Sequence, residues 1–208
     1  MRNNCLLLFF ATLVIGCTLS FGSYAQESGK CCGKGCCKKA KHNTAIENIF
    51  NRKSVRSFTG RAVPKDTLEL LVKAGMAAPT GMNRQPWDFV IVENKAEMEA
   101  LAQKMPRAKM LQSAGAAIVV VGNPEVSKNW MLDCAAATEN ILLAAESMGL
   151  GAVWTAGWPY EDRIAEINGA FNIPEPYVPL CLIPIGYPTG ENTPKDKWKP
   201  EKVHYNKW

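Results

Sequence analysis

Short apolar runs alternate with amphipathic helical patterns from residue 44 onward, and this alternation is the strongest constraint on the fold. The runs Phe89–Val92, Ala116–Val121 and Val178–Gly186 are typical of strands that are buried on both faces. Helical patterns lie between them, and helices are what cover such a sheet in a domain of this size. The sequence therefore predicts one α/β or α+β sandwich with a central sheet covered on both faces.

Caps and chain breakers place the helices. Thr44 and Glu47 form a capping-box signature that starts a first helix, whose apolar face carries Ile46, Ile49 and Phe50. The other predicted elements are helices from Pro64 to just before Pro79 and over Ala96–Lys104, Leu132–Met148 and Glu161–Asn168, a strand over Ala152–Thr155, an interruption of the last strand at Pro184, and an extended arm over Pro188–Trp208.

Residues 1–25 have the pattern of a secretory signal peptide. Arg2 precedes the apolar stretch Leu6–Ile15, and small residues end at Ala25 as a cleavage site. The apolar stretch is shorter than the roughly 20 residues of a membrane-spanning helix, so no membrane span is expected. The segment Val14–Cys17 resembles a lipobox, which makes a lipid anchor on Cys17 the alternative. Either route exports the protein, with the periplasm as the expected location; a cytosolic enzyme with a wrongly placed start is a third option.

Residues 26–43 are rich in cysteine, lysine and glycine and are predicted to form a flexible tail. Four thiolates match the ligand count for zinc or copper(I). However, the adjacent cysteines do not match the spacing of structural zinc sites, and disulfides are the plainer outcome in an oxidising compartment. The cluster consists of Cys31, Cys32, Cys36 and Cys37. Cys134 and Cys181 lie in apolar segments and are expected in the core.

The formal net charge of +5 comes from the first 43 residues, and the rest of the chain is formally neutral. Proteins that bind nucleic acids concentrate positive charge on the folded body, so nucleic acid is not an expected partner. The chain has two histidines, His42 and His204, and lacks the G-x-S-x-G, H-E-x-x-H and Walker patterns. A Ser-His-Asp triad or a histidine-ligated zinc is therefore not expected.

Two segments have the composition of a cofactor site. Arg52–Phe58 places three cations and two hydroxyls together, which suits a phosphate and a polyol chain. The alternative is a solvated helix end whose cations complement the helix dipole. Ala78–Trp87 holds the amides of Asn83 and Gln85 between prolines, which suits hydrogen bonding to a heterocycle, although an ordinary Pro/Gly connection has the same composition.

The residues resemble the nitroreductase family of FMN-dependent oxidoreductases. The resemblance covers about Thr44 to Trp208, in four motifs that occur in the family's order. The matching residues are Arg52, Ser54, Arg56 and Phe58; Ala78-Pro79, Gln85-Pro86-Trp87 and Phe89; Asn140, Glu146, Gly149-Leu150-Gly151-Ala152 and Trp154; and Pro184, Gly186-Tyr187-Pro188, His204-Tyr205 and Trp208.

The resemblance implies an α+β fold over residues 44–208, with a central, mostly antiparallel sheet flanked by helices, in a domain-swapped homodimer with FMN at the subunit interface. It assigns the phosphate, ribityl chain and pyrimidine edge to Arg52, Lys53, Ser54 and Arg56, the isoalloxazine to Asn83 and Gln85, the backbone near flavin N5 to Thr155, Ala156 and Gly157, and the phosphate also to Lys195 and Lys197. Lys197 stands where many relatives have arginine, which loses the bidentate fork.

The implied activity is ping-pong hydride transfer from NADH or NADPH through flavin N5 to a small acceptor such as a nitroaromatic or a quinone, with no catalytic side chain. Nicotinamide cofactors are scarce outside the cytoplasm. The alternative is therefore a non-enzymatic exported module that binds flavin or metal through the Cys31–Cys37 cluster. Trp87 and Trp154 are expected to pack in the core or a dimer interface. Trp158 is the candidate wall of a substrate pocket, and Trp130 is a weaker one.

Overall fold

The computed structural model describes residues 44–208. The predicted signal peptide, the tail over residues 26–43 and the Cys31–Cys37 cluster lie outside the described residues, so these predictions stay predictions. Across residues 44–208 no helix is long and apolar enough to cross a membrane. The same residues contain no group of three His, Cys, Asp or Glu side chains placed to hold a metal ion.

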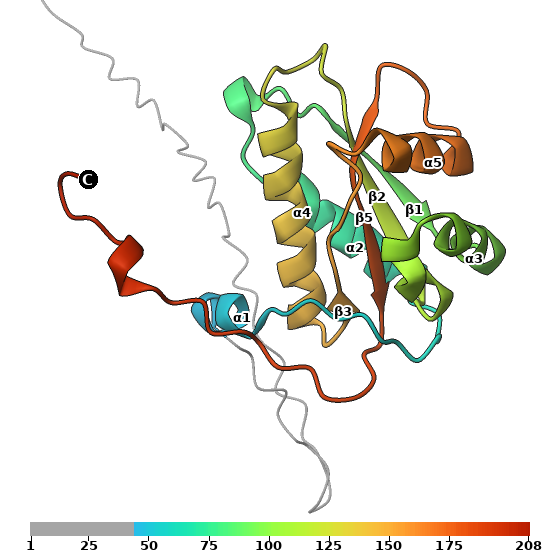
Figure 1. Ribbon diagram of the computed structural model, residues 1–208, viewed down its shortest axis with the longest axis horizontal. Helices are drawn as coiled ribbons and strands as arrows, with labels where there is room; N and C mark the ends of the chain where they lie inside the picture. The colour runs from blue at the N-terminus through green and yellow to red at the C-terminus, as the bar shows by residue number, and fades with distance from the viewer. Residues whose placement is uncertain (1–43) are drawn as a thin grey trace, which may run out of the picture. The chain divides into compact units, whose positions relative to one another are not determined.

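A five-stranded sheet forms the centre of the fold (Figure 1). Its order is β1 (Trp87–Val92), β2 (Ala116–Gly122), β5 (Val178–Gly186) and β3 (Gly151–Ala152), and β4 (Thr155–Ala156) also pairs with β5. Every pairing between these strands is antiparallel. The predicted antiparallel sheet is therefore confirmed.

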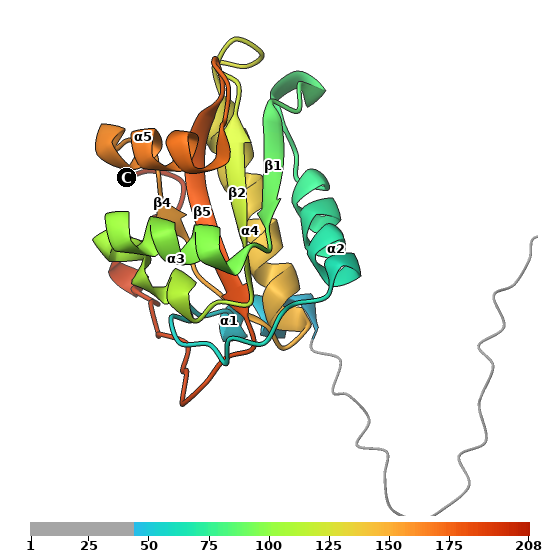
Figure 2. The same ribbon diagram turned by 90° about the vertical axis from the view of Figure 1, so that its right-hand side faces the viewer.

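Helices cover both faces of the sheet (Figure 2). On one face lie α2 (Lys65–Met76) and α4 (Trp130–Ser147), and on the other lie α3 (Lys95–Lys104) and α5 (Glu161–Phe171). The short 3₁₀ stretch η2 (Pro106–Gln112), which the sequence patterns did not predict, follows α3. The α+β sandwich is confirmed, and the predicted helices are present with ends shifted by up to three residues.

Strand β2 is buried at every position because both of its faces are covered. Ile118 and Val120 pack into the cluster with α2 and α4, whereas Val119 and Val121 pack into the cluster with α3 and α5. Successive side chains of a strand point to opposite faces, so a strand in this place needs apolar residues at every position. This explains the unbroken apolar run that the sequence shows.

The prediction of one strand over Ala152–Thr155 is wrong, and Pro184 gives the reason. Strands β3 and β4 are separate, yet both pair with β5 in one continuous register. Between them, the Val153 N–H donates to the Pro184 carbonyl oxygen at 3.4 Å. Proline has no N–H to return that bond, so the ladder breaks at this point.

The predicted interruption of β5 itself at Pro184 is also wrong. β5 continues unbroken from Val178 to Gly186. The carbonyl oxygen of Pro184 points toward β3 and β4. The nitrogen of Pro184, which has no hydrogen to donate, points to the same side. Pairing with β2, where Pro184 lies opposite Ala117, is therefore kept.

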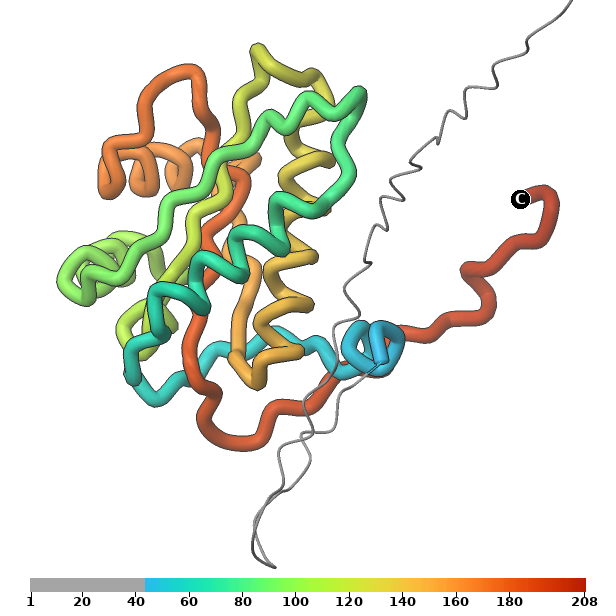
Figure 3. Tube along the Cα trace, turned by 180° about the vertical axis from the view of Figure 1, so that it is seen from behind, coloured from blue at the N-terminus to red at the C-terminus, as the bar shows by residue number. Residues whose placement is uncertain are grey.

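The first helix and part of the C-terminal arm lie beside each other, away from the sheet (Figure 3). α1 (Ala45–Asn51) begins with the predicted capping box, in which the Glu47 N–H donates to Thr44 Oγ1 at 3.2 Å. None of its residues is buried, so the expected apolar face of Ile46, Ile49 and Phe50 is left uncovered. The chain after β5 runs past α1 as the predicted extended arm, with one 3₁₀ turn, η3 (Pro200–Lys202) (Figure 3).

Cys134 and Cys181 lie in the core between α4 and β5, as predicted. Neither forms a disulfide within the described residues, and Thr138 Oγ1 lies 3.4 Å from Cys181 Sγ. Burial raises the pKa of both thiols to about 12. Both are therefore protonated at neutral pH and act as apolar core groups.

The segment Arg52–Phe58 is fixed to the sheet by its backbone. The Val55 N–H donates to the Ala152 carbonyl oxygen at 3.0 Å, next to a parallel bridge between Ser54 and Ala152. A Cβ atom on Gly151 would lie 2.6 Å from Val55 Cγ1. The absence of a side chain at Gly151 therefore lets this segment lie against β3.

We expect Gly151→Ala to lower the free energy of unfolding by about 1–3 kcal/mol, because the added methyl group overpacks against buried Val55. Gly169→Ala is the matched control, since Gly169 lies in α5 with no atom within 4 Å of the added Cβ. That substitution is expected to stabilise the protein by about 0.5–1 kcal/mol through helix propensity. Urea unfolding followed by circular dichroism measures both, and equal effects of the two variants would contradict the packing argument.

Candidate functional site

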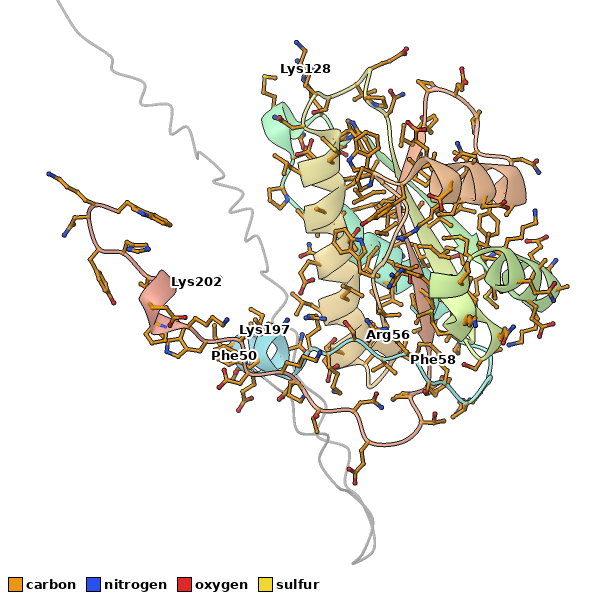
Figure 4. The ribbon with its side chains drawn as sticks, viewed as in Figure 1. Phe50, Arg56, Phe58, Lys128, Lys197 and Lys202 are labelled. Atoms are coloured by element: carbon orange, nitrogen blue, oxygen red, sulfur yellow. The ribbon has the colours of Figure 1, made fainter. Side chains whose placement is uncertain are left out.

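A pocket rich in basic side chains forms where the segment after α1 meets the C-terminal arm. We call it the cationic pocket; its volume is about 230 Å³. In Figure 4, Arg56 lies on the segment after α1, and Lys197 lies on the arm beside α1. The lining residues are basic, apart from two with hydroxyl groups: Arg52, Lys53, Ser54, Arg56, Thr193, Lys195 and Lys197. Six predicted site residues are thus brought together from distant parts of the sequence.

Two of these cations are held by carboxylates of α4. Arg52 Nε lies 3.1 Å from Glu139 Oε1, and Lys53 Nζ lies 2.6 Å from Glu146 Oε1. Lys53 also contacts the Asn51 carbonyl oxygen at 3.4 Å, so its ammonium group is largely engaged. Arg52 uses only Nε in its ion pair, which leaves two terminal nitrogens as donors. Lys53 therefore serves to hold the Arg52–Phe58 segment against α4. Arg52 also holds this segment, and its two terminal nitrogens are left to bind a ligand.

The donor set of the cationic pocket fits a phosphate group. Arg52, Arg56, Lys195 and Lys197 supply charged N–H donors, and Ser54 and Thr193 supply hydroxyls. No carboxylate lines the pocket, so an anion meets no like charge at its wall. Guanidinium and ammonium groups together are the usual ligands of phosphate oxygens. Thr193 was not predicted, because an isolated threonine in a Pro-rich arm carries no pattern.

A second cavity adjoins the first. We call it the Thr155 cavity; its volume is about 450 Å³, within the usual range for small-molecule sites. Arg56 lines both cavities, which makes them neighbours. The lining residues are Arg56, Pro106, Arg107, Lys109, Met110, Val153, Trp154, Thr155, Ala156 and Arg163. Predicted residues Thr155 and Ala156 are there, and Gly157 is buried behind them, where its N–H donates to the Leu180 carbonyl oxygen at 2.9 Å.

Among the lining residues of the Thr155 cavity that the sequence patterns did not assign to the site are Arg107, Lys109, Met110 and Arg163. The first three lie on η2, and Arg163 lies in the first turn of α5. Cations next to a helix start or a proline have the composition of a solvated surface, so no local signal singles them out. A helical plot would not reveal them either, because two separate elements contribute them.

Within one chain, Asn83 and Gln85 line neither the cationic pocket nor the Thr155 cavity. They lie in and just after the short helix η1 (Gly81–Asn83), and the Gly81 N–H donates to Asp133 Oδ1 at 3.0 Å, in the first turn of α4. Lys53 is tied to Glu146, near the last residue of α4. At 1.5 Å per residue, the two anchoring points are about 20 Å apart along the helix.

The loop that carries Asn83 and Gln85 has an unusual backbone. Met82, Asn83 and Gln85 have positive φ values of 53°, 54° and 48°, a region that costs free energy for residues other than glycine. Polar contacts hold this shape: the Gln85 N–H donates to Thr80 Oγ1 at 3.2 Å, and Gln85 Nε2 donates to Asn83 Oδ1 at 3.0 Å. Both amides are therefore presented in a fixed arrangement on the surface.

Trp87 and Trp154 lie as expected, whereas neither of the candidate pocket walls, Trp158 and the weaker candidate Trp130, lines the cationic pocket or the Thr155 cavity. Trp87 is buried, and Trp154 packs against the core and lines the Thr155 cavity. Trp130 is also buried, and its ring meets that of Trp158 edge-on with centroids 5.6 Å apart. Trp158 lines neither the cationic pocket nor the Thr155 cavity. Within a single chain, the structure does not support it as a pocket wall.

Known proteins are similar to this chain in both sequence and structure. The model of the nitroreductase family matches residues 49–117 and 102–187. A Methanothermobacter thermautotrophicus protein is 36% identical over 173 residues, covering 82% of this chain and 91% of the relative. A Bacteroides thetaiotaomicron crystal structure is 49% identical, with a TM-score of 0.78 over 80% of this chain and 99% of that one. Both are described as "putative NADH dehydrogenase/NAD(P)H nitroreductase".

A third similar protein is named for its cofactor. The FMN-dependent nitroreductase of Clostridium difficile R20291 is 27% identical, with a TM-score of 0.74 over 78% of this chain and 99% of that one. The family match spans most of the described residues, and the Methanothermobacter thermautotrophicus relative aligns over 91% of its own length. The chain belongs to the nitroreductase family, whose members are NAD(P)H- and FMN-dependent oxidoreductases.

Proposed function

We propose that this oxidoreductase binds FMN and transfers a hydride from NADH or NADPH to a small acceptor such as a nitroaromatic or a quinone. The observation that carries the proposal is the cationic pocket joined to the Thr155 cavity at Arg56. One compartment suits a phosphate, and the other has room for a ring system. When bound, FMN supplies the hydride chemistry, alternating between the donor and the acceptor.

The protein's own residues have binding and orienting tasks. Arg52, Lys195 and Lys197 are proposed to hold the phosphate, and Ser54 and Arg56 to hold the polyol chain and the near edge of the ring. Thr155 and Ala156, with Gly157 behind them, are proposed to form the wall beside the ring. Neither cavity is lined by a histidine or a carboxylate, so the described lining offers no imidazole or carboxylate as a general base.

We propose that the active form is a homodimer in which the Asn83–Gln85 loop of one copy completes the site of the other. In a twofold pair, antiparallel contact between the α4 helices places the start of one helix beside the end of its partner. Within one chain the Asn83–Gln85 loop and Lys53 are anchored about 20 Å apart along α4. In the antiparallel pair, the loop of one copy would instead lie beside the Lys53 of the other copy. The antiparallel pairing also covers exposed Leu132 and half-buried Ala135 and Leu143, which lie on the outer face of α4.

The C-terminal arm supports the same assembly. Trp198, Tyr205 and Trp208 are exposed, and so are Ile49 and Phe50 of α1 beside the arm. Large apolar groups in contiguous exposed positions mark interaction surfaces. An arm that wraps around a second copy would bury them, in the manner of a domain-swapped pair.

Location remains a proposal drawn from residues 1–25. We propose export through the general secretion route and cleavage after Ala25, with the periplasm as the destination and lipidation at Cys17 as the alternative. The competing function, a non-enzymatic flavin- or metal-binding module using the Cys31–Cys37 cluster, gains no support from residues 44–208. The first experiment below separates the two functions.

The purified protein is expected to show the absorbance bands of oxidised flavin after incubation with FMN. Anaerobic addition of NADH or NADPH is expected to bleach these bands, and a quinone or a nitroaromatic is expected to restore them, because the flavin takes and gives the hydride in turn. Bands that persist with both donors would contradict NAD(P)H as the reductant. A colourless protein that refuses FMN would contradict the proposed function altogether.

Lys197→Ala is expected to raise the dissociation constant for FMN about tenfold, because one charge-assisted hydrogen bond to the phosphate is lost. Lys197→Arg is expected to tighten binding by restoring a bidentate donor. Lys202→Ala is the matched control: it lies on the same arm, is exposed and lines neither cavity. Fluorescence titration of flavin measures all three variants, and equal losses at Lys197 and Lys202 would contradict the pocket assignment.

A complementation experiment tests the shared site. One variant carries Lys195→Ala and Lys197→Ala, the other carries Asn83→Ala and Gln85→Ala, and each alone is expected to bind FMN poorly. A mixed dimer, obtained by co-expression with two affinity tags, is expected to regain one FMN per two chains, because one of its two composite sites is intact. If a single chain holds the whole site, every site in the mixed dimer stays damaged, and no recovery is observed.

A further inference from the structure

Arg107 and Arg163 lie where the Thr155 cavity meets a third cavity. This third cavity, which we call the Lys104 cavity, has a volume of about 480 Å³ and lies between η2 and α5. Pro106, Arg107 and Arg163 line both cavities, so the two guanidinium groups stand at their common boundary. Neither residue belongs to the cationic pocket.

Arg163 is held in place before any ligand arrives. Its Nη1 donates to the Ala156 carbonyl oxygen at 3.2 Å, and its Cζ lies 3.8 Å from the centre of the Tyr160 ring. These contacts fix the guanidinium against the backbone that forms the wall of the Thr155 cavity. One terminal nitrogen is engaged, and the remaining donors are left for a ligand. An ordered guanidinium loses little further entropy on binding an oxyanion.

Arg107 complements it from the opposite element. It is exposed on η2 and forms no ion pair or side-chain hydrogen bond with the described residues. No ion pair or side-chain hydrogen bond within residues 44–208 therefore gives Arg107 a role in holding the fold. A cation that has no ion pair or side-chain hydrogen bond within residues 44–208 and that lines two cavities is placed to bind a ligand.

The charge around this pair favours an anion on the side of the Thr155 cavity. Arg56, Arg107, Lys109 and Arg163 all line that cavity, and no carboxylate does. In the Lys104 cavity, Asp162 and Glu166 are present, but Glu166 is paired with Lys104 at 3.2 Å. The net positive charge of the lining is therefore greater in the Thr155 cavity than in the Lys104 cavity.

We propose that Arg107 and Arg163 form a subsite for an oxyanion group, a phosphate, sulfonate or carboxylate, carried by the substrate that enters the Thr155 cavity. This inference rests on the proposed function and narrows its substrate class to anionic molecules. The oxyanion has two possible sources, the 2′-phosphate that distinguishes NADPH from NADH and an acidic group on the electron acceptor. In both cases the two guanidinium groups select the substrate by charge, in addition to the ring stacking that any flavin site offers.

The test compares, in separate half-reactions, partners that carry an additional oxyanion with matched partners that lack it. The variants are Arg107→Gln, Arg163→Gln and the double variant; Arg163→Lys retains the charge without the fork. The donor arm measures anaerobic reduction of the FMN-loaded protein by NADPH and by NADH. The acceptor arm measures reoxidation by 1,4-naphthoquinone-2-sulfonate and by neutral 1,4-naphthoquinone. The control is Lys73→Gln, an exposed cation on α2, which lies on the other face of the sheet.

The double variant is expected to weaken use of NADPH or of the sulfonate about tenfold or more, while use of the matched partner that lacks this group, NADH or 1,4-naphthoquinone, changes less than about twofold. A selective loss with NADPH names the 2′-phosphate, and a selective loss with the sulfonate names the acceptor. Added salt is expected to reduce the preference of the wild-type protein for the same anionic partner, because ions screen exposed charges. Equal changes for the two partners within each arm, or no change in either arm, would overturn the subsite.

A binding measurement separates this inference from the proposed function. Calorimetric titration of 1,4-naphthoquinone-2-sulfonate and of NADP⁺ into the oxidised protein needs no turnover, and flavin absorbance reports FMN content independently. If the variants keep wild-type FMN content and lose anion binding, both proposals stand. If the wild-type protein holds no FMN, the proposed function fails, and binding of either anion that Arg107→Gln abolishes would still support the subsite. Binding of both anions that is unaffected by Arg107→Gln would overturn it.

Discussion

The backbone pairing of β5 with the short strands β3 and β4 is the interaction on which the candidate site depends. β3 presents the Ala152 carbonyl oxygen that holds Val55, and through Val55 the segment that carries Arg52, Ser54 and Arg56. β4 carries Thr155 and Ala156 directly. The missing N–H of Pro184 opens the ladder between these two strands, so that Val153 and Trp154 also reach the Thr155 cavity. One strand therefore positions both compartments of the site.

Helix α4 sets the second constraint, because it ties the two halves of the predicted site to its opposite ends. Asp133, in its first turn, holds the loop of Asn83, and Glu146, near its end, holds Lys53. A straight helix keeps these points apart in one chain. In the proposed twofold dimer, the start of each α4 would lie beside the end of the partner's α4, which would bring the two halves of the predicted site together. The proposed dimer would cover the exposed apolar groups of α1, α4 and the C-terminal arm.

Charge is distributed in a way that fits a flavoprotein with an anionic substrate. The described chain pairs some of its cations with carboxylates, as in Arg52 with Glu139 and Lys104 with Glu166. The cations that line the Thr155 cavity face no carboxylate across it. No histidine or carboxylate lines the cationic pocket or the Thr155 cavity, and the tasks proposed for the described residues are binding, orientation and selection.

The sequence alone determined what depends on neighbouring residues: the buried strands, the capping box of Thr44 and Glu47, the core placement of Cys134 and Cys181, and the cluster of cations after α1. Hydrophobic period and cap chemistry are local, so they can be read without a fold. Only the tertiary structure decided that Pro184 splits β3 from β4, that the face of α1 with Phe50 stays uncovered, and that Arg107 and Arg163 meet at a cavity boundary. Each of these depends on contacts between elements far apart in the chain, and no local pattern encodes which surface cations will converge.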